Sequence, residues 1–515
     1  MMRRLAERYD KQLQRVLEII PGVLTWSLLL SPIWLGILFP SAIVYLLTFL
    51  TVYWAYLGIK YTTGLIIGYK RYKDELKVDW ASEVTKLDFA GIPDKATLPT
   101  SLQDIRHFLL IPACNEPYTV LHDSIESIFN QTFPVNQIFL VYTIEQKNSE
   151  RIISDIKEIL NGREKELGGF YIFVHPSGIV GEAIGAGAAN RTWGAKHGVE
   201  ELTKQNALIK NYIFSTIDAD HVIHAQYLAR LTHLYLSSDK RNNRFYSTAV
   251  HSFDNNYWKV PTVMRIEATS ILLGAMADWI VSNVEIKDTF AAYSASLQTL
   301  IDADYWDVAL GIDDTVFYWR AFFARNGDFL GTPHFIPYAA DAVQGNSYLN
   351  SYQSLYKQLL RWGWGVIVFP LSVKGFIKHY TVPFRFKLLW LADQFQKKVL
   401  LVSIVFLITF GFSILTIVNE GVRQTNFAYS LPYITSFILT CTLVFLIPGT
   451  IIRFRMVKPI PQAWPFWRKA LAFCEGPLII LNLLTFSSVP YIQAQTSMMF
   501  GKKMKDLYFT PKVRM

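Results

Sequence analysis

Long apolar stretches open and close the chain, and a polar segment lies between them. Residues 22–40, 41–58, 399–418 and 427–452 contain no charged side chain, and each has about the ~20 residues that an α-helix needs to cross a bilayer. A proline turn without charge joins the first two stretches. We therefore expect a transmembrane helical hairpin at the N-terminus and a second membrane block that begins near Val399.

Between these blocks, apolar runs of strand length alternate with runs of helix length. We expect strands and helices in turn, over residues 107–112, 118–130, 137–144, 149–161 and 169–175. This βαβ rhythm predicts an α/β fold with a largely parallel sheet, in which ligands bind beyond the carboxyl ends of the strands.

Residues 266–284 are also apolar, but Glu267 and Asp278 lie inside this stretch. Ionisable residues are costly at membrane depth, so a buried or interfacial helix is the better interpretation. Residues 382–398 carry Arg385, Lys387, Lys397 and Lys398 and resemble an amphipathic helix that lies in the headgroup layer.

Basic residues flank the apolar stretches and set the expected orientation. They precede the hairpin (Arg3, Arg4, Arg8, Lys11, Arg15), follow it (Lys60, Lys70, Arg71, Lys73) and recur in the loop 453–469 and in the tail. The positive-inside bias places these segments in the cytoplasm. A full membrane crossing over residues 470–492 would place the Lys-rich tail outside the cell. Because Glu475, Gly476, Pro477 and Pro490 interrupt that stretch, we expect it to be broken, re-entrant or interfacial.

These patterns divide the chain into five regions. We expect an N-terminal tail and transmembrane hairpin, a cytoplasmic α/β domain, interfacial amphipathic helices, a C-terminal transmembrane region and a cytoplasmic tail, over residues 1–71, 72–371, 372–398, 399–495 and 496–515.

Composition supports a membrane protein and argues against nucleic-acid binding. Hydrophobic residues make up 51% of the 515 residues, which is unusual for a wholly soluble chain. The net charge is +9, but the basic residues gather beside the apolar stretches and do not alternate with aromatics, so acidic lipid headgroups are the expected partner. The three cysteines have neither metal-type spacing nor the density of a disulfide framework.

Two carboxylates follow the apolar run 211–217, which we expect to be a strand. Asp218 and Asp220 are one residue apart, an arrangement that suits a hard divalent cation, Mg2+ or Mn2+, that must also hold a diphosphate. His221 and His224 could bind zinc, but a capping or surface role is the simpler interpretation.

A second acidic pair, Asp313 and Asp314, precedes an expected helix that begins at Thr315. A carboxylate in this position can accept the proton of an attacking hydroxyl, and burial near Trp306 and Phe317 would raise its pKa. Alternatively an acidic residue here caps the helix. Both residues are candidate catalytic groups, and the two roles are compatible, with Asp313 as the cap and Asp314 as the base.

A third signature is Gln358-Leu359-Leu360-Arg361-Trp362, on an expected helix. The i, i+3 spacing places Gln358 and Arg361 on one helix face. Arginine binds phosphate through two N–H groups, and tryptophan offers a flat face on which a sugar ring can stack. An amphipathic helix on the membrane surface would explain the pattern without any catalytic role.

With these three signatures in this order, most of the chain resembles the membrane-integrated inverting glycosyltransferases of family two, the cellulose-synthase-like and hyaluronan-synthase-like group. The resemblance implies a GT-A (nucleotide-diphospho-sugar transferase) domain. It implies that Asp220 binds the metal directly, that Asp218 bonds the ribose or the metal shell, and that Asp314 is the general base. It further implies that Gln358, Arg361 and Trp362 contact the acceptor or the diphosphate.

Other positions are assigned only through this resemblance. Residues 111–116 resemble the family's first-strand turn, which implies that Glu116 lies near the nucleotide. Glu145 stands where relatives have an acidic residue that accepts a hydrogen bond from the uracil ring. Relatives often carry a phosphate-binding lysine near Asn190, for which Arg191 would substitute. Residues 507–512 resemble a gating loop, with Thr510 and Lys512 retained.

The expected function is transfer of a sugar from a nucleotide-diphosphate donor, a UDP-sugar by the resemblance, to a hydroxyl of a glycan with inversion. Processive polysaccharide synthesis with export at the plasma membrane is the leading hypothesis. Expected partners are the nucleotide sugar, a growing glycan or lipid-linked acceptor, and membrane lipids, and an accessory export protein or a homo-oligomer is compatible with this function. Three alternatives stay open: transfer of one sugar to a lipid or lipid-linked acceptor, a transporter or channel without transferase activity, and an inactive relative that only binds partners.

Overall fold

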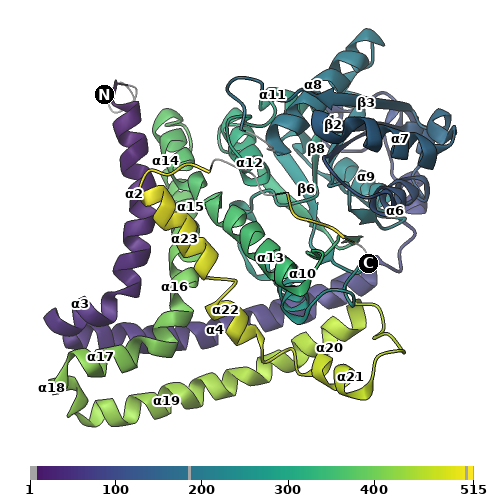
Figure 1. The fold of residues 1–515 in the computed structure, drawn as a ribbon. Coiled ribbons are helices and arrows are strands. Elements are labelled where there is room, and N and C mark those ends of the chain that lie inside the picture. Colours follow the sequence, from purple (N-terminus) through teal and green to yellow (C-terminus); the bar gives the residue numbers. More distant parts are fainter. Residues whose placement is uncertain (1–7, 184–186, 505–508, 514–515) are drawn as a thin grey trace.

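The computed structural model describes residues 8–183, 187–504 and 509–513. An α/β domain lies beside a set of long helices (Figure 1). The expectations that concern Arg3, Arg4, Leu507 and Tyr508 fall outside the described residues.

In the described part of the chain, the main sheet of the α/β domain has seven strands in the order β3-β2-β1-β4-β8-β6-β9. Their bounds are β1 (Arg106–Ala113), β2 (Ile138–Glu145), β3 (Gly169–His175), β4 (Tyr212–Thr216), β6 (Arg244–Thr248), β8 (Tyr293–Ser296) and β9 (Leu330–His334). The pairs among β1–β4 are parallel, and so is β6 with β9. The fold is thus α/β with a largely parallel sheet, which confirms the prediction.

Strand β8 is the one antiparallel member of this sheet among the described residues, and it pairs with both β4 and β6. A second, three-stranded sheet has the order β5-β10-β7, formed by β5 (Val222–Ile223), β7 (His251–Ser252) and β10 (Tyr338–Ala339). Its strands β5, β7 and β10 follow β4, β6 and β9 respectively in the chain, and the adjoining loops surround the candidate site.

The strands form where β-branched and aromatic residues are continuous, because strands covered on both faces need no polar alternation. All residues of β1 except Arg106 and Pro112 are buried, and every residue of β4 is buried. Helices α6 (Tyr118–Phe129), α7 (Ser149–Leu160), α8 (Gly187–Lys204) and α9 (Tyr227–Ser237) cover the sheet, and their apolar faces join two cores on its opposite sides.

The helix α10 (Thr262–Val281) packs along α4 (Pro40–Glu75). Close approach explains this contact, since a Cβ at Gly64 would meet Val281 and one at Gly68 would meet Met276. Helix α10 is not among the helices that are long and apolar enough to cross a membrane, which agrees with the prediction of a buried or interfacial helix.

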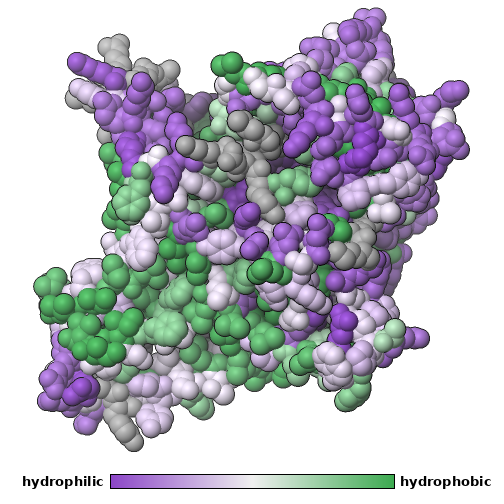
Figure 2. Space-filling view, viewed as in Figure 1, coloured by the Kyte–Doolittle hydropathy of each residue, from purple (hydrophilic) through white to green (hydrophobic). Residues whose placement is uncertain are grey.

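Among the described residues, three helical segments are long and apolar enough to cross a membrane: Pro40–Glu75, Phe384–Val418 and Ser430–Met456. A bent pair, α2 (Asp10–Leu29) and α3 (Ser31–Leu38), would add a fourth span if it counts as one. Hydrophobic side chains gather over α3, α4 and α17 (Phe412–Val418), whereas the visible surface of the α/β domain is mostly hydrophilic (Figure 2).

The expected hairpin differs in detail from this arrangement. Residues 22–40 do not form one straight helix, because α2 and α3 meet at 64°. The helix bends at Ser31-Pro32, where proline lacks the N–H that would continue the hydrogen-bond ladder.

Two further stretches can be compared with the expected regions. Residues 384–398 continue into the following span as one helical segment, Phe384–Val418, and a π-helical stretch, Phe395–Leu400, lies at the expected boundary. Residues 470–492 are broken, as predicted, into α21 (Phe466–Phe473), α22 (Ile479–Leu484) and the start of α23 (Val489–Met499).

Candidate functional site

The carboxyl ends of β1, β2 and β4 meet at one edge of the sheet, because these neighbouring strands are parallel. Glu116 follows β1, Glu145 ends β2, and Asp218 and Asp220 follow β4. This is the edge at which open α/β sheets bind ligands.

Asp218, Asp220 and His221 form a group of potential metal ligands whose donor atoms lie within 4.8 Å of one another. Asp220 and His221 are buried, with 2% and 3% of their surface exposed. The Nδ1 atom of His221 accepts a hydrogen bond from the Asp218 backbone N–H at 3.2 Å. The expected surface role of His221 is therefore wrong, although the side chain does cap this turn.

The C-terminal tail enters the same place. Residues Gln344 and Lys512 form a β-bridge, and the N–H of Val513 donates to the Gln344 carbonyl at 3.1 Å. This bridge directs the Lys512 ammonium onto the Asp220 carboxylate. The other Asp220 oxygen accepts the Asp341 backbone N–H at 2.9 Å.

The Lys512 contact shows that the Asp220 position accommodates a cation. Burial by itself would raise the pKa of Asp220, but the nearby Lys512 charge outweighs it and lowers the pKa below its ordinary value. Two carboxylates and an imidazole at this distance also fit a divalent ion that keeps open positions for a diphosphate. Asp218 and Asp220, with His221 beside them, are the residues that would hold it.

Arg191, on α8, links the two acidic motifs. It is 5% exposed, its Nη2 donates to Asp218 at 2.6 Å and its Nη1 pairs with Asp313. Burial opposes ionisation of Asp218, yet the guanidinium holds the pKa of that carboxyl far below its usual range. Arg191 thus brings together residues that lie about a hundred positions apart in the chain.

Asp313 and Asp314 occupy the start of α12 (Asp314–Ala324), and Asp313 is the N-cap. The Asp314 Oδ2 accepts the backbone N–H of Ala291 at 3.2 Å. Its Oδ1 is buried and has no hydrogen-bond partner among the described residues. Burial raises the pKa of Asp314 to about 6, so this carboxyl can exchange a proton near neutral pH.

Helix α13 (Tyr348–Gly363) carries the third signature and forms another wall of the site. Gln358 and Trp362 line the same cavity as Asp218, Asp220 and Lys512. The Arg361 charge acts on both Asp218 and Asp314, where it lowers the pKa of each carboxyl. Thr510, in the tail, is buried, and its hydroxyl has no partner among the described residues.

Three predicted site residues remain, Glu116, Asn190 and Glu145, and they differ in their contacts. Glu116 is 5% exposed, and one of its oxygens accepts the backbone N–H groups of Cys114 and Asn115. The Asn190 amide bonds to Thr143 and to the carbonyls of Ala113 and Thr143. These contacts tie α8 to β1 and β2, so they give Asn190 a structural role.

Glu145 belongs to a short chain of ion pairs at the end of β2. His175 lies between Glu145 and Glu182, with its ring nitrogens 3.3 and 2.9 Å from the two carboxylates. Burial opposes protonation of His175, but the two acids raise its pKa above the ordinary value. These ion pairs hold Glu145 at the edge of the sheet where the strands end.

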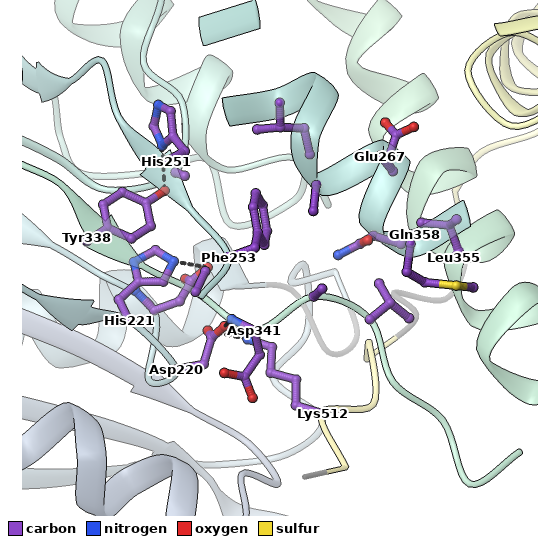
Figure 3. Close-up of a pocket in the computed structure, with 18 of the residues that line it drawn as sticks. Asp220, His221, His251, Phe253, Glu267, Tyr338, Asp341, Leu355, Gln358 and Lys512 are labelled. Atoms are coloured by element: carbon purple, nitrogen blue, oxygen red, sulfur yellow. Dashed lines mark hydrogen bonds and ion pairs between the residues drawn. The ribbon is translucent and has the colours of Figure 1, made fainter. Parts of the chain in front are cut away.

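Figure 3 shows the cavity that these elements enclose. Asp220, Asp341 and Lys512 lie on one side of it, and Glu267, Leu355 and Gln358 lie on the other. His221 and His251 stand beside Tyr338, whose hydroxyl is 2.6 Å from His251 Nδ1.

Several lining residues carry no sequence signal that would have identified them. These residues, Glu267, Phe290, Tyr338 and Asp341, come from an apolar helix, from the short strand β10 and from irregular loops. Only the folded arrangement brings them to the acidic motifs, because each contacts partners far away in the sequence.

Known proteins offer a limited comparison. The sequence matches no protein-family model and no curated protein. Among solved structures, the chain is similar to the mannosyltransferase PcManGT from Pyrobaculum calidifontis in complex with GDP-Man and Mn2+, at 14% identity and a TM-score of 0.41, over 80% of this chain and 98% of that one. It is also similar to S. aureus TarS 1–349 in complex with UDP-GlcNAc, at 11% identity and a TM-score of 0.33, over 77% and 93% of the two chains.

Proposed function

We propose that this protein is a membrane-associated, metal-dependent glycosyltransferase that moves a sugar from a nucleotide-diphosphate donor to a glycan hydroxyl with inversion. The observation that carries the proposal is the convergence of Asp218, Asp220 and Trp362 around one cavity at the carboxyl edge of a parallel sheet, with Asp314 hydrogen-bonded to the backbone of the lining residue Ala291. Acidic metal ligands, a base with a raised pKa and an aromatic sugar platform are the groups that such a transfer needs.

In the proposed reaction, Asp314 accepts the proton of the acceptor hydroxyl. The hydroxyl oxygen then forms a bond to the anomeric carbon of the donor sugar while the bond from that carbon to the diphosphate oxygen breaks. The nucleoside diphosphate leaves, and the new glycosidic bond has inverted configuration. The Asp314 oxygen that has no hydrogen-bond partner among the described residues suits this step, since it has unused capacity to accept a substrate proton.

The donor diphosphate would lie near Asp218, Asp220 and Lys512. A divalent ion bound there would stabilise the negative charge of the departing diphosphate. Lys512 and Arg361 are cations within reach of the same charge. Glu145, held by His175, would accept the N3–H of a uracil ring, which makes a UDP-sugar the proposed donor.

The three helical segments of the described chain that are long and apolar enough to cross a membrane support a reaction at the membrane surface. Because α13 carries Gln358 and Trp362 and also packs on α23, the acceptor end of the cavity adjoins the helical part of the protein. We extend the proposal to chain elongation at the cytoplasmic face, with the product leaving along the helices.

A donor-hydrolysis and transfer assay tests the proposal. Purified protein with Mn2+ or Mg2+ and a panel of nucleotide sugars is expected to release nucleoside diphosphate, and Asp220→Asn is expected to lower the rate by at least about 100-fold. Asp239→Asn, at a carboxylate that is 77% exposed, is the matched control. If the wild type releases no nucleoside diphosphate from any donor, the proposal is wrong.

A further inference from the structure

The cavity continues beyond the acidic motifs toward α10. Its lining runs from Asp220 and Lys512, past Trp362 and Gln358, to Glu267. Figure 3 shows Glu267 and Gln358 together on the side opposite Asp220. If the donor diphosphate lies at Asp220, the Glu267 end is left for the acceptor.

Glu267 is a carboxyl in an otherwise apolar part of the wall, among Met264, Ala268, Ile271 and Leu355. Burying such a group costs free energy unless it is hydrogen-bonded. Its Oε2 accepts from Asn482 at 2.8 Å and from Ser487 at 3.4 Å, both in the α22 region. Within the described part of the chain no hydrogen bond reaches Oε1, so the carboxyl is fixed in place with one oxygen left for a ligand.

An aromatic wall lies beside this carboxyl. The Phe290 side chain is 43% exposed although it lines the cavity. Its ring meets Trp362 edge-on, with centroids 6.3 Å apart, and meets His251 in the same way at 5.4 Å. Apolar ring faces beside carboxylate and amide groups match a pyranose, which has an apolar face and a rim of hydroxyls.

The charges of the lining exclude an anionic ligand at this end. Among the described residues that line the cavity, Lys512 is the only lysine or arginine, and it is already paired with Asp220. Burial raises the pKa of Glu267, which favours hydrogen bonds to neutral hydroxyls over ion pairing. A phosphate or uronate beside Glu267 would lack a cation to balance it.

We infer that Glu267, with Gln358 and the Phe290–Trp362 wall, forms an acceptor subsite for an uncharged sugar unit of a glycan chain. The inference rests on the proposed function and names its acceptor class. A uronate-containing chain, or an acceptor whose phosphate must sit at this end, is excluded by the same geometry.

Direct binding tests this subsite without turnover. Neutral tetrasaccharides of glucose, N-acetylglucosamine, galactose and mannose, and tetragalacturonate as the anionic probe, are titrated into purified full-length protein by isothermal calorimetry. At least one neutral tetrasaccharide is expected to bind, and tetragalacturonate is expected not to bind. Glu267→Leu is expected to weaken neutral binding about 10- to 100-fold, whereas Glu200→Leu, at an exposed position on α8, leaves it unchanged.

Further measurements distinguish sugar recognition by Glu267 from a mere packing role. They also test the subsite separately from the proposed function. Affinity for UDP with Mn2+ is expected to be the same in Glu267→Leu and wild type, and Glu267→Gln is expected to recover most of the sugar binding. If Asn482→Leu and Glu267→Leu lower the unfolding temperature and sugar binding equally, the carboxyl is only a packing partner. Tetragalacturonate binding, or no neutral binding in a protein that binds UDP, would overturn the subsite; loss of UDP binding in the wild type would instead contradict the proposed function.

Discussion

At the scale of single residues, Asp314 is the position whose chemistry can be tested most directly. Asp314→Asn removes the proton acceptor while keeping the shape and the Ala291 contact. We expect kcat to fall about 100- to 10,000-fold with little change in donor affinity. Steady-state kinetics with nucleotide binding measured in parallel checks both. An equal effect from Asp239→Asn would show that the loss is not specific to the base.

The pH profile follows from the raised pKa of the same carboxyl. Asp314 must be ionised to accept a proton, and burial raises its pKa to about 6. Below pH 6, kcat/KM is expected to fall about tenfold per unit, and above it to level off. An unperturbed aspartate would move the break to about pH 3.9. A profile flat between pH 5 and 7 would therefore contradict the assignment.

Arg191 is the residue on which the arrangement of the acidic motifs depends. Arg191→Met leaves Asp218 and Asp313 without their shared cation. We expect the free energy of unfolding to fall by roughly 2–4 kcal/mol. This loss is smaller than for a fully buried ion pair, because the Asp218 side chain is 42% exposed. Thermal unfolding in detergent measures the change. Arg385→Met, at a side chain that is 73% exposed, should change little.

The same ion pair gives stability a pH dependence of known sign. The pKa of Asp218 is lower in the folded protein than in the unfolded chain. Its contribution is therefore fully present above roughly pH 4 and is lost as the pH falls into the acid range. Arg191→Met is expected to flatten this acid limb of the stability curve.

At the scale of elements, the C-terminal tail is the segment with two competing partners. Lys512 pairs with Asp220, so the ammonium and a divalent cation would compete for one carboxylate. Lys512→Met is expected to tighten Mn2+ binding in the absence of nucleotide by about fivefold, from roughly 1 kcal/mol for the pair. Calorimetric or spin-resonance titration with Mn2+ tests this. Weaker Mn2+ binding by the variant would show that Lys512 supports the site rather than competes for it.

The elements also show how far the sequence predicts the structure. Strands β1, β2 and β3 and helices α6 and α7 agree with prediction to within one or two residues at each end, because each has a clear periodicity and turn residues at its ends. The antiparallel strand β8 was not foreseen. The strand Tyr293–Ser296 is short and consists mostly of small residues, and its place between β4 and β6 depends on long-range pairing.

The candidate site likewise contains residues that the sequence predicts and residues that only the fold brings together. Asp218, Asp220, Asp314 and Trp362 could be found from the sequence because each belongs to a short motif. Glu267 could not, since an acid within an apolar helix gives no sign of whether it faces lipid, a neighbour or a cavity. The bend between α2 and α3 was also missed, because Ser31-Pro32 can start a helix as well as interrupt one.

At the scale of the whole molecule, the long helices must be covered by something other than this chain. The apolar window of Ser430–Met456 has none of its residues buried inside the protein, and Phe437 is 70% exposed. Lipid is the cover that agrees with the absence of charge in this window. Solubility only in detergent, and resistance to extraction by alkaline carbonate, are therefore expected.

This cover implies a topology, which is the last prediction. Helices α4 and α19 (Asn426–Thr442) pack side by side, and the short helix α18 (Glu420–Arg423) lies at their end away from the sheet (Figure 1). If both helices cross the bilayer, the loop at α18 and the α/β domain lie on opposite sides. The positive-inside bias then places the sheet and the tail in the cytoplasm.

Single-cysteine labelling tests the topology in intact cells. In a background with Cys114→Ser, Cys441→Ser and Cys474→Ser, Gln424→Cys is expected to react with a membrane-impermeant maleimide. Lys503→Cys, equally exposed in the structure, is expected to react only after permeabilisation. Because both positions are accessible to solvent, a difference in labelling reports the membrane and not burial. Labelling of Lys503→Cys from outside would place the donor site on the side of the membrane that lacks nucleotide sugars, which would contradict the proposed function as well as the topology.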